Sequence, residues 1–263
     1  MTDNDALLYE KRGSVAWLTL NRPHAMNAIN LDMVALYENY LPKIAADGSI
    51  RVLVITGTGQ AFCAGADLKQ VLDGMNVAPG EQDFLDRLCE NVFDPLRNFC
   101  KPVIAALNGL TMAGGLETAM CADIVLASDT AKIGDAHANF GVYPGAGGAA
   151  LLPRLVPHNV AKYLLLTGKN LSAHEMREYG FVNEVVAPDA LTERAQELAE
   201  LISKHSPIAL RRMKRVADST LGMSREDALA NEQVEFRKHQ RSWDFHEGLR
   251  AFSEKRVPEF QGR

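Results

Sequence analysis

Short apolar runs and segments with helical spacing alternate along the first 190 residues. Alternating β-forming residues predict a strand in "SVAWLTL", and compact apolar runs predict buried strands in "IRVLVITGTG", "KPVIAALNG" and "DIVLAS". Apolar residues three and four apart predict helices in "NLDMVALYENYLPKIAADG", "ADLKQVLDGM", "FLDRLCENVFDPLRNF" and "LSAHEMREYG". Because strands alternate with helices, we expect βα units and an α/β fold.

The remainder of the chain has a different pattern. From Ala190 to about Lys255 almost every apolar position has helical spacing, with breaks near residues 206 and 221. We therefore expect two parts. An α/β core over residues 1–190 holds the functional site, and a helical region follows over residues 191–263.

Composition excludes several classes of protein. The net charge of −5 gives no reason to expect a nucleic-acid partner or an anionic membrane surface, and no apolar run approaches the ~20 residues of a membrane span. The first residues, "MTDNDALLYEKRG", lack the pattern of a targeting signal. The spacing of the four cysteines is not that of a metal site: Cys63, Cys89, Cys100 and Cys121. We therefore expect reduced thiols, no metal site and a cytoplasmic protein.

Two stretches repeat the order strand, glycine-rich turn, helix. They are "VLVITGTGQAFCAGADLKQ" and "KPVIAALNGLTMAGGLETAM", the second with a helix over "TMAGGLETAM". A helix start carries backbone N–H groups without an intrahelical partner, and glycine lets another molecule approach them closely. Two such starts that face one cavity would offer two N–H groups to a single oxygen atom, which is an oxyanion hole.

In the second stretch Gly114 is the candidate donor. Glu117 lies one turn later and on the same face, because positions i and i+3 of a helix are neighbours. A carboxylate beside such a hole is suited to act as a general base or, when protonated, as a general acid. In the alternative interpretation Glu117 only complements the helix N-terminus, and the glycines only permit tight packing.

Nucleotide-binding interpretations of the glycine-rich turns receive little support. The segment "GTGQAF" follows a strand but lacks the third glycine of a dinucleotide fingerprint. No clear strand feeds "GAGGAA", and neither segment ends in the Gly-Lys-Ser/Thr sequence of a phosphate-binding loop.

Five motifs in order resemble the crotonase, or enoyl-CoA hydratase/isomerase, family: "LNRPHAMNAI", "VLVITGTGQAFCAGADLK", "KPVIAALNGLTMAGGLETAMCADIVLAS", "GVYPGAGGAALLPRLV" and "EGLRAFSEKRVPEF". The resemblance implies a spiral of ββα units with a helical C-terminal trimerisation region, assembled as a homotrimer or a dimer of trimers. It also implies acyl-CoA thioester substrates, which react through an enolate held in an oxyanion hole without a metal or redox cofactor.

The resemblance also assigns individual residues. Ala66 in "CAGAD" matches the first oxyanion-hole donor, and Gly114 in "AGGLE" matches the second. The remaining positions match residues that contact the substrate or its coenzyme A part: Ala25, Met26, Ala64, Asp67, Leu68, Lys69, Gly115, Tyr143, Phe252 and Lys255. The last two would act on the ligand of a neighbouring subunit.

One position departs from the family pattern. Hydratases of this family carry two glutamates, the first of which matches Glu117, whereas the second falls on His137 in "DAHANFG". A histidine with an ordinary pKa near ~6.5 is able to serve as acid or base, so Glu117 and His137 form a candidate acid–base pair. We expect Asp135 to lie in a surface turn; the alternatives are that it orients the imidazole or supplies the second acid.

These residues favour hydration of a 2-enoyl-CoA. Double-bond isomerisation is an alternative, because it needs only one base. Hydrolysis of a carbon–carbon bond is disfavoured, since the related hydrolases tend to carry an acid where "PGAGG" has Ala146. A catalytically weak acyl-CoA-binding relative is the remaining alternative, and the acyl chain length stays open.

The walls of the acyl site are also open to interpretation. We expect the loop from Met75 to about Asp83 to roof the acyl chain. Tyr143 and Phe140 either shape the acyl pocket or pack in the core. His24 is expected to be a turn residue, with contact to coenzyme A as the alternative.

Overall fold

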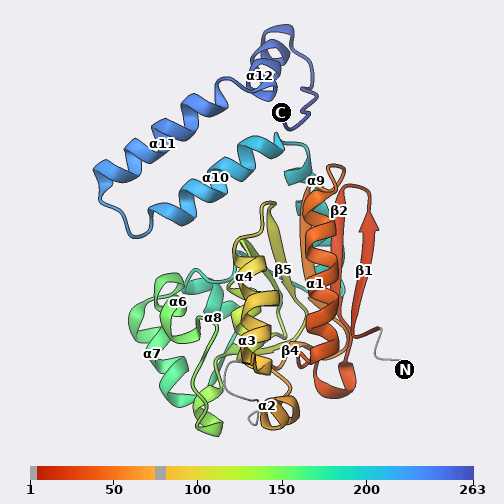
Figure 1. Cartoon of the computed structure of the whole chain (residues 1–263), viewed down its shortest axis with the longest axis vertical. Coiled ribbons are helices and arrows are strands. Elements are labelled where there is room, and N and C mark those ends of the chain that lie inside the picture. Colours follow the sequence, from red (N-terminus) through yellow and green to blue (C-terminus); the bar gives the residue numbers. More distant parts are fainter. Residues whose placement is uncertain (1–4, 75–80) are drawn as a thin grey trace.

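The computed structural model of the chain describes residues 5–74 and 81–263 (Figure 1). Within these ranges, no helix is both long enough and apolar enough to cross a membrane. Most of the loop expected to roof the acyl chain, residues 75–80, lies outside the described residues.

A mostly parallel sheet forms the centre of the molecule. In the described residues it has six strands in the order β1 (Leu7–Arg12), β2 (Val15–Leu20), β3 (Val52–Gly57), β5 (Val103–Leu107), β7 (Ile124–Ser128) and β10 (Glu184–Val186). β1 runs antiparallel to β2, and the other neighbours are parallel. The predicted α/β fold is therefore confirmed. β1 was not predicted, because only its first residue, Leu7, is buried and the rest lacks an apolar pattern.

A second, smaller sheet explains the repeat in the sequence. Its order is β4 (Ala61–Cys63), β6 (Leu110–Met112), β8 (Lys132–Gly134) and β9 (Asn170–Ser172), with β9 antiparallel to β8. Twice the chain passes from the large sheet to the small one and then into a helix: β3, β4 and α2 (Leu68–Gly74), then β5, β6 and α5 (Gly114–Ala119). This is the expected ββα repetition. The predicted helix over "TMAGGLETAM" starts too early, because Thr111 and Met112 belong to β6.

Helices cover both faces of the large sheet, and strand alternation divides the core between them. On one face lie α1 (Leu31–Ala46), α3 (Phe84–Leu88), a π-helical turn (Cys89–Phe93) and α4 (Asp94–Arg97). On the other, Trp17, Val54 and Ile104 pack against α9 (Leu191–Ser203). Burial of each large apolar side chain contributes about 1.5–3 kcal/mol, so the two clusters hold the sheet rigidly.

Helix caps fix the ends of several of these helices. Asn30 accepts a hydrogen bond from the backbone N–H of Met33 and begins α1. Ser172 and Glu175 form a capping box at the start of α8 (Ala173–Glu178), and Gly180 follows it with φ +85°.

Two further helices, α6 (Gly148–Leu155) and α7 (His158–Thr167), complete the core beside α8.

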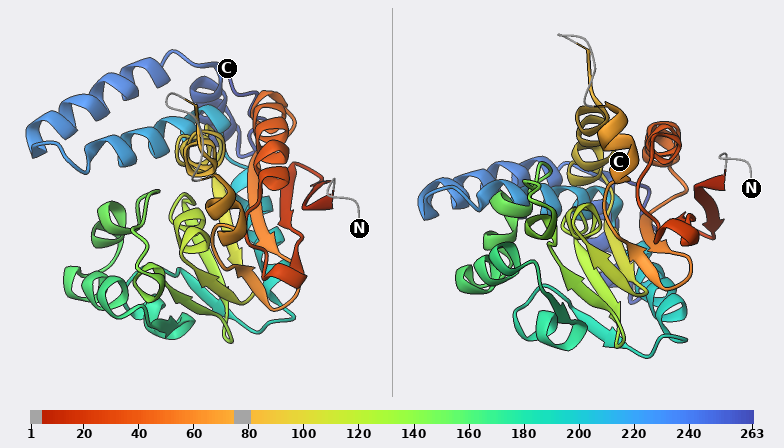
Figure 2. Two further views of the ribbon diagram at one scale, coloured as in Figure 1. Left: turned by 60° about the horizontal axis from the view of Figure 1, so that its bottom comes forward. Right: turned by 90° about the horizontal axis from the view of Figure 1, so that it is seen from below.

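The C-terminal helices form an arm that projects from the core (Figures 1 and 2). It consists of α10 (Pro207–Thr220), α11 (Arg225–His239) and α12 (Trp243–Glu254), with the predicted breaks between them. The predicted boundary at residue 190 is too early. Helix α9 packs on the large sheet through Leu191, Ala195 and Ala199 and is part of the core, so the arm begins at α10.

Candidate active site

The small sheet brings the two glycine-rich turns together. β4 and β6 are parallel neighbours, so the chain leaves both strands at the same edge before it enters α2 and α5. Ala66 and Gly114 lie at these two exits. A Cβ atom placed on Gly114 would be 3.3 Å from the backbone nitrogen of Ala66. The two predicted N–H donors are therefore close neighbours.

Backbone pairing determines which way the Ala66 peptide faces. Ile29 donates its N–H to the Gly65 carbonyl at 2.8 Å, and the Asp67 N–H donates to the Ile29 carbonyl, also at 2.8 Å. In a parallel ladder, the residue between two such bonds directs its own N–H away from the partner strand. The Ala66 N–H therefore faces away from Ile29, and Ala66 lines the large cavity described below.

The start of α5 has an unusual backbone conformation. Ala113, the residue before the helix, has φ 49° and ψ −121°. Residues other than glycine rarely adopt this backbone conformation. Such a residue costs about 1–3 kcal/mol and is typical of functional sites. Gly114 follows this strained turn as the first residue of α5, and both Ala113 and Gly114 line the cavity described below.

Gly115 has a packing role. A Cβ atom at this position would overlap the carbonyl oxygen of Cys63, because α5 lies directly against β4. Gly115 is buried and does not line the cavity. Gly115 is therefore not among the predicted binding residues that line the cavity, and the glycine is needed for the close approach of helix and strand.

Glu117 is held by a turn from another part of the chain. The residue is 3% exposed, and its Oε1 accepts hydrogen bonds from the backbone N–H groups of Ala146 at 2.9 Å and Gly148 at 3.0 Å. Burial raises the pKa of the carboxyl, and these two hydrogen bonds partly oppose the rise. The hydrogen bonds that hold the carboxylate thus come from Ala146 and Gly148 and not from the N-terminus of its own helix, α5. Glu117 is among the residues that line the cavity.

His137 is the second titratable group at the site, and it is joined to Asp135. Asp135 Oδ1 lies 3.0 Å from His137 Nδ1 and also accepts the His137 backbone N–H at 3.2 Å. Burial lowers the pKa of His137, but the hydrogen bond and charge of Asp135, with the charge of Glu117, raise it more, so the net shift is upward. The expectation of a surface turn for Asp135 is wrong, because the residue is only 1% exposed.

One cavity of about 850 Å³ unites these groups. Ala66, Gly114, Glu117 and His137, the four predicted catalytic residues, all line it. Six of the predicted binding residues do so as well: Ala25, Ala64, Asp67, Leu68, Lys69 and Tyr143. Met26 does not line the cavity, but its carbonyl accepts the N–H of Ala64 at 3.0 Å and so holds the lining segment in place.

The lining of the cavity includes both basic and apolar residues. Three basic residues, Arg22, His24 and Lys69, contribute to its lining, and Arg22 forms an ion pair with Asp67 at 3.0 Å. A different stretch of the lining is apolar, and sequence reasoning did not identify it because its residues have an ordinary helical core pattern: Leu85, Leu88, Cys89 and Phe93. This wall comes from α3 and the π-helical turn.

The aromatic residues of the loop after β8 are not core residues. Phe140 is 69% exposed and Tyr143 is 80% exposed, and both line the cavity. His24, expected to be a turn residue, lies in a short 3-10 turn (Pro23–Ala25) that also lines the cavity. Residues from the loop after β2 and from the loop after β8 thus border the same space.

Phe252 and Lys255 lie apart from this site. They belong to the end of α12, in the projecting arm (Figure 1), and neither is among the residues that line the cavity. Phe252 is 86% exposed. Within one chain these two predicted binding residues are therefore not brought to the other candidates.

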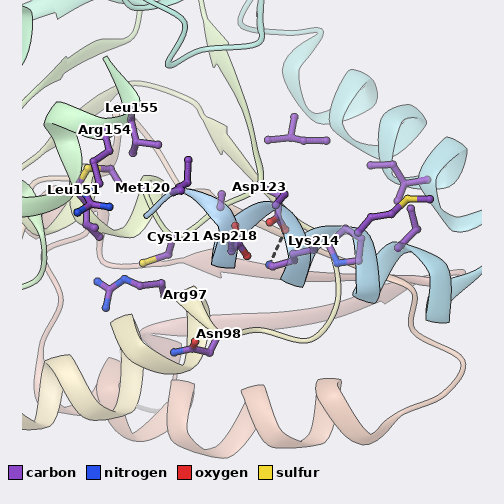
Figure 3. A pocket seen from close by; sticks show the side chains of 18 of the residues that line it. Arg97, Asn98, Met120, Cys121, Asp123, Leu151, Arg154, Leu155, Lys214 and Asp218 are labelled. Atoms are coloured by element: carbon purple, nitrogen blue, oxygen red, sulfur yellow. Dashed lines mark hydrogen bonds and ion pairs between the residues drawn. The ribbon is translucent and has the colours of Figure 1, made fainter. Parts of the chain in front are cut away.

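A second pocket of about 820 Å³ lies between α10 and the core (Figure 3). Lys214 and Asp123 form an ion pair across it at 2.8 Å, and Asp123 also accepts the backbone N–H of Val103. The rest of the lining is largely apolar. Glu117 and His137 line the first cavity, together with the adjacent Ala66 and Gly114. We therefore assign the candidate active site to the first cavity.

The chain is similar to known proteins over almost its whole length. The sequence profile described as enoyl-CoA hydratase/isomerase matches residues 10–263. The chain is 36% identical to the 2,3-dehydroadipyl-CoA hydratase of Escherichia coli, with 98% of this chain and 99% of the relative covered. It is also 36% identical to the short-chain-enoyl-CoA hydratase of Clostridium acetobutylicum, with 95% of each covered.

Solved structures give the same result. The enoyl-CoA hydratase of Bacillus anthracis superimposes with a TM-score of 0.89 at 32% identity, covering 98% of this chain and 100% of that one. The expected fold is confirmed by this similarity and by the ββα units described above. The chain belongs to the enoyl-CoA hydratase/isomerase family.

Proposed function

We propose that this protein adds water to the double bond of a 2-enoyl-CoA, with Glu117 and His137 as the acid–base pair. One observation carries the proposal: both side chains line the cavity that also contains the adjacent Ala66 and Gly114 peptides. The relatives named above are, by name, a 2,3-dehydroadipyl-CoA hydratase and a short-chain-enoyl-CoA hydratase, and an enoyl-CoA thioester is what the cavity is proposed to accept.

The Ala66 and Gly114 N–H groups would bind the thioester oxygen. As water adds to the β-carbon, the electron pair of the double bond moves onto this oxygen, and two aligned N–H dipoles stabilise the resulting enolate. Their close spacing supports this role, because two donors can reach one oxygen only when they are neighbours.

The pKa shifts support a division of labour between the two side chains. Glu117 has a pKa raised by burial, so it is a stronger base than an exposed carboxylate and would take the proton of the attacking water. His137 has a net upward shift, so its protonated form is more populated near neutral pH, and it would donate a proton to the α-carbon. The hydroxyl group of the water thereby adds to the β-carbon, and the proton from His137 adds to the α-carbon. Glu117 then releases the proton it has taken up and His137 regains one from solvent, so both groups return to their starting states.

The proposed chemistry requires no metal or redox cofactor, since the N–H pair polarises the carbonyl and the side chains move the protons. We also propose a homotrimer or a dimer of trimers, in which Phe252 and Lys255 complete a neighbouring subunit's coenzyme A site; the projecting, exposed position of α12 supports this. Sedimentation equilibrium tests the assembly. A cytoplasmic location is proposed as well, supported by unpaired cysteines in the described residues.

Turnover of crotonyl-CoA tests the proposal directly. Hydration removes the conjugated double bond, and we expect a loss of its ultraviolet absorbance together with formation of the 3-hydroxyacyl-CoA, identified by mass spectrometry. Binding of a panel of 2-enoyl-CoA substrates without turnover would instead favour the catalytically weak relative. Conversion of 3-enoyl-CoA without hydration would favour isomerisation.

Replacement of His137 by Ala is expected to lower kcat for hydration at least tenfold, because the proposed proton donor is lost; general acid–base groups contribute about 10²–10⁴-fold. Steady-state kinetics on crotonyl-CoA measure the effect. His158→Ala, on α7 outside the cavity, serves as the matched control and should retain normal turnover. Near-normal turnover of His137→Ala would assign His137 to structure.

A further inference from the structure

We propose that Asp135 is a positioning residue that fixes the tautomer and the direction of the His137 imidazole. The inference rests on the proposed hydration, in which His137 exchanges a proton with the substrate. It gives a role at the site to a residue whose polar sequence context predicts a surface turn.

The backbone brings the Asp135 carboxylate under the imidazole. Asp135 follows β8, which is paired on one side with β6 and on the other with β9, so its position is fixed by the small sheet. Ala136 adopts a left-handed conformation with φ 62°, and the chain turns back at this residue. As a result one oxygen, Asp135 Oδ1, contacts both the backbone N–H and the Nδ1 atom of His137.

This contact determines which nitrogen of His137 can react. A carboxylate only accepts hydrogen bonds, so the ring nitrogen that faces it, Nδ1, must carry a hydrogen. The other nitrogen, Nε2, is then the atom that accepts or donates the reacting proton. Without Asp135 the ring would be free to adopt the opposite tautomer or to rotate away from the cavity.

Asp135 also acts through its charge. It raises the pKa of His137, and it adds to the upward shift of Glu117. The other oxygen, Oδ2, lies on the side of Gly148 and Glu117: a Cβ on Gly148 would be 2.8 Å from Oδ2 and 3.4 Å from Glu117 Oε1. Glu117 on α5 is the further charged group facing His137, and Cys89 and Tyr143 line the same cavity.

A purely structural role does not account for this carboxylate. Oδ2 is buried and has no hydrogen-bond partner in the described residues. Such an oxygen is unfavourable for folding, because its desolvation is not compensated. Burial of Asp135 therefore costs folding free energy, while its other oxygen holds the His137 imidazole. A positioning residue is expected to combine these two properties.

The variant Asp135→Asn tests the inference. We expect kcat for crotonyl-CoA hydration to fall about tenfold or more, with KM little changed, because replacing a carboxylate that fixes the tautomer of a catalytic histidine by an amide lowers kcat, by up to about 10⁴-fold in the best-known case. The variant should remain folded with undiminished thermal stability, since the buried carboxylate is replaced by a neutral amide. Asp123→Asn is the matched control, because Asp123 lies in the second pocket, and it should leave the pH profile of kcat unchanged.

The pH profile should move in a defined direction. Asp135 raises the pKa values of both His137 and Glu117, so its removal lowers both. Each limb of the profile should therefore shift to lower pH in Asp135→Asn, whichever of the two groups acts as acid. Unshifted limbs would contradict the inference.

Two further measurements separate this inference from the proposed function. In the double variant Asp135→Asn, His137→Ala, measured at the pH optimum of each variant, the Asp135 substitution should have little further effect on kcat. Its positioning role acts through His137, and its charge effect on Glu117 only moves the pH profile; multiplied effects at the optimum would overturn the positioning role. NMR titration of isotopically labelled histidine, assigned by its loss in His137→Ala, should show a lower pKa for His137 in Asp135→Asn. An unchanged pKa would overturn the inference, whereas an inactive wild-type protein would contradict only the proposed hydration.

Discussion

Replacement of Glu117 by Gln is expected to lower kcat for crotonyl-CoA hydration by about 10²–10⁴-fold, the range typical for loss of a general base. Gln has nearly the same shape, and its carbonyl oxygen retains the hydrogen bonds from the Ala146 and Gly148 N–H groups. It cannot accept the proton of the attacking water. Stopped-flow or steady-state loss of enoyl absorbance measures the effect, and binding of the substrate should be largely preserved.

Thermal unfolding provides the control for this substitution. The pKa of Glu117 is raised in the folded protein, so the folded state binds a proton more readily than the unfolded chain does. This carboxyl therefore makes the protein less stable as the pH rises through the window above its ordinary pKa of 4.5. Glu117→Gln should be at least as stable as the wild type at neutral pH. Normal turnover in a folded Glu117→Gln variant would remove Glu117 from the mechanism.

Gly114→Pro is expected to lower kcat by about 10²–10³-fold, which corresponds to the loss of about 2.7–4 kcal/mol from one oxyanion-hole donor. Proline has no backbone N–H, so the second donor to the thioester oxygen is deleted. Gly114 is the first residue of α5, where a missing N–H breaks no intrahelical bond. Steady-state kinetics on crotonyl-CoA, with circular dichroism to verify folding, measure the result.

Gly114→Ala is the matched control for crowding. A Cβ at this position would lie 3.3 Å from both the Ala66 nitrogen and the Gly65 Cα, so either substitution introduces a tight contact. Alanine keeps the N–H, whereas proline does not. The ratio of the two activities therefore isolates the hydrogen-bond donor, and equal activities would contradict the role of the Gly114 peptide.

The large elements of the fold followed from the sequence because their apolar patterns are long. The buried strands β3, β5 and β7 and the helix α1 lie where compact runs or helical spacing predicted them. The strands of the small sheet were missed. Each has three residues, too few for a period of two to be recognised.

The candidate site could be predicted only in part. The repeated strand–turn–helix pattern identified Gly114 and Glu117, and family resemblance added Ala66 and His137. The sequence could not reveal that the Ala146 and Gly148 amides hold Glu117, because these residues are about thirty positions away and are joined to it only by the tertiary fold. The burial of Asp135 was likewise hidden, since "DAHANFG" has the polar composition of a surface loop.

The contacts of Gly115 explain why it does not line the cavity. Gly115 belongs to a motif that approaches the substrate, yet it faces β4, because neighbouring residues of a helix point in different directions. Gly114 and Glu117, three positions apart, share the face toward the cavity. The site is therefore built from one face of α5, the turn after β4 and the loop after β8.

Infrared difference spectroscopy of a bound acyl-CoA, labelled with ¹³C at the thioester carbonyl, measures polarisation of that bond without turnover. If the Ala66 and Gly114 peptides both donate to the oxygen, the carbonyl stretch moves to a lower frequency on binding in the wild type and in Glu117→Gln, and the shift is reduced in Gly114→Pro but retained in Gly114→Ala. A bound carbonyl that absorbs at its frequency in water, or a full shift in Gly114→Pro, would contradict the account.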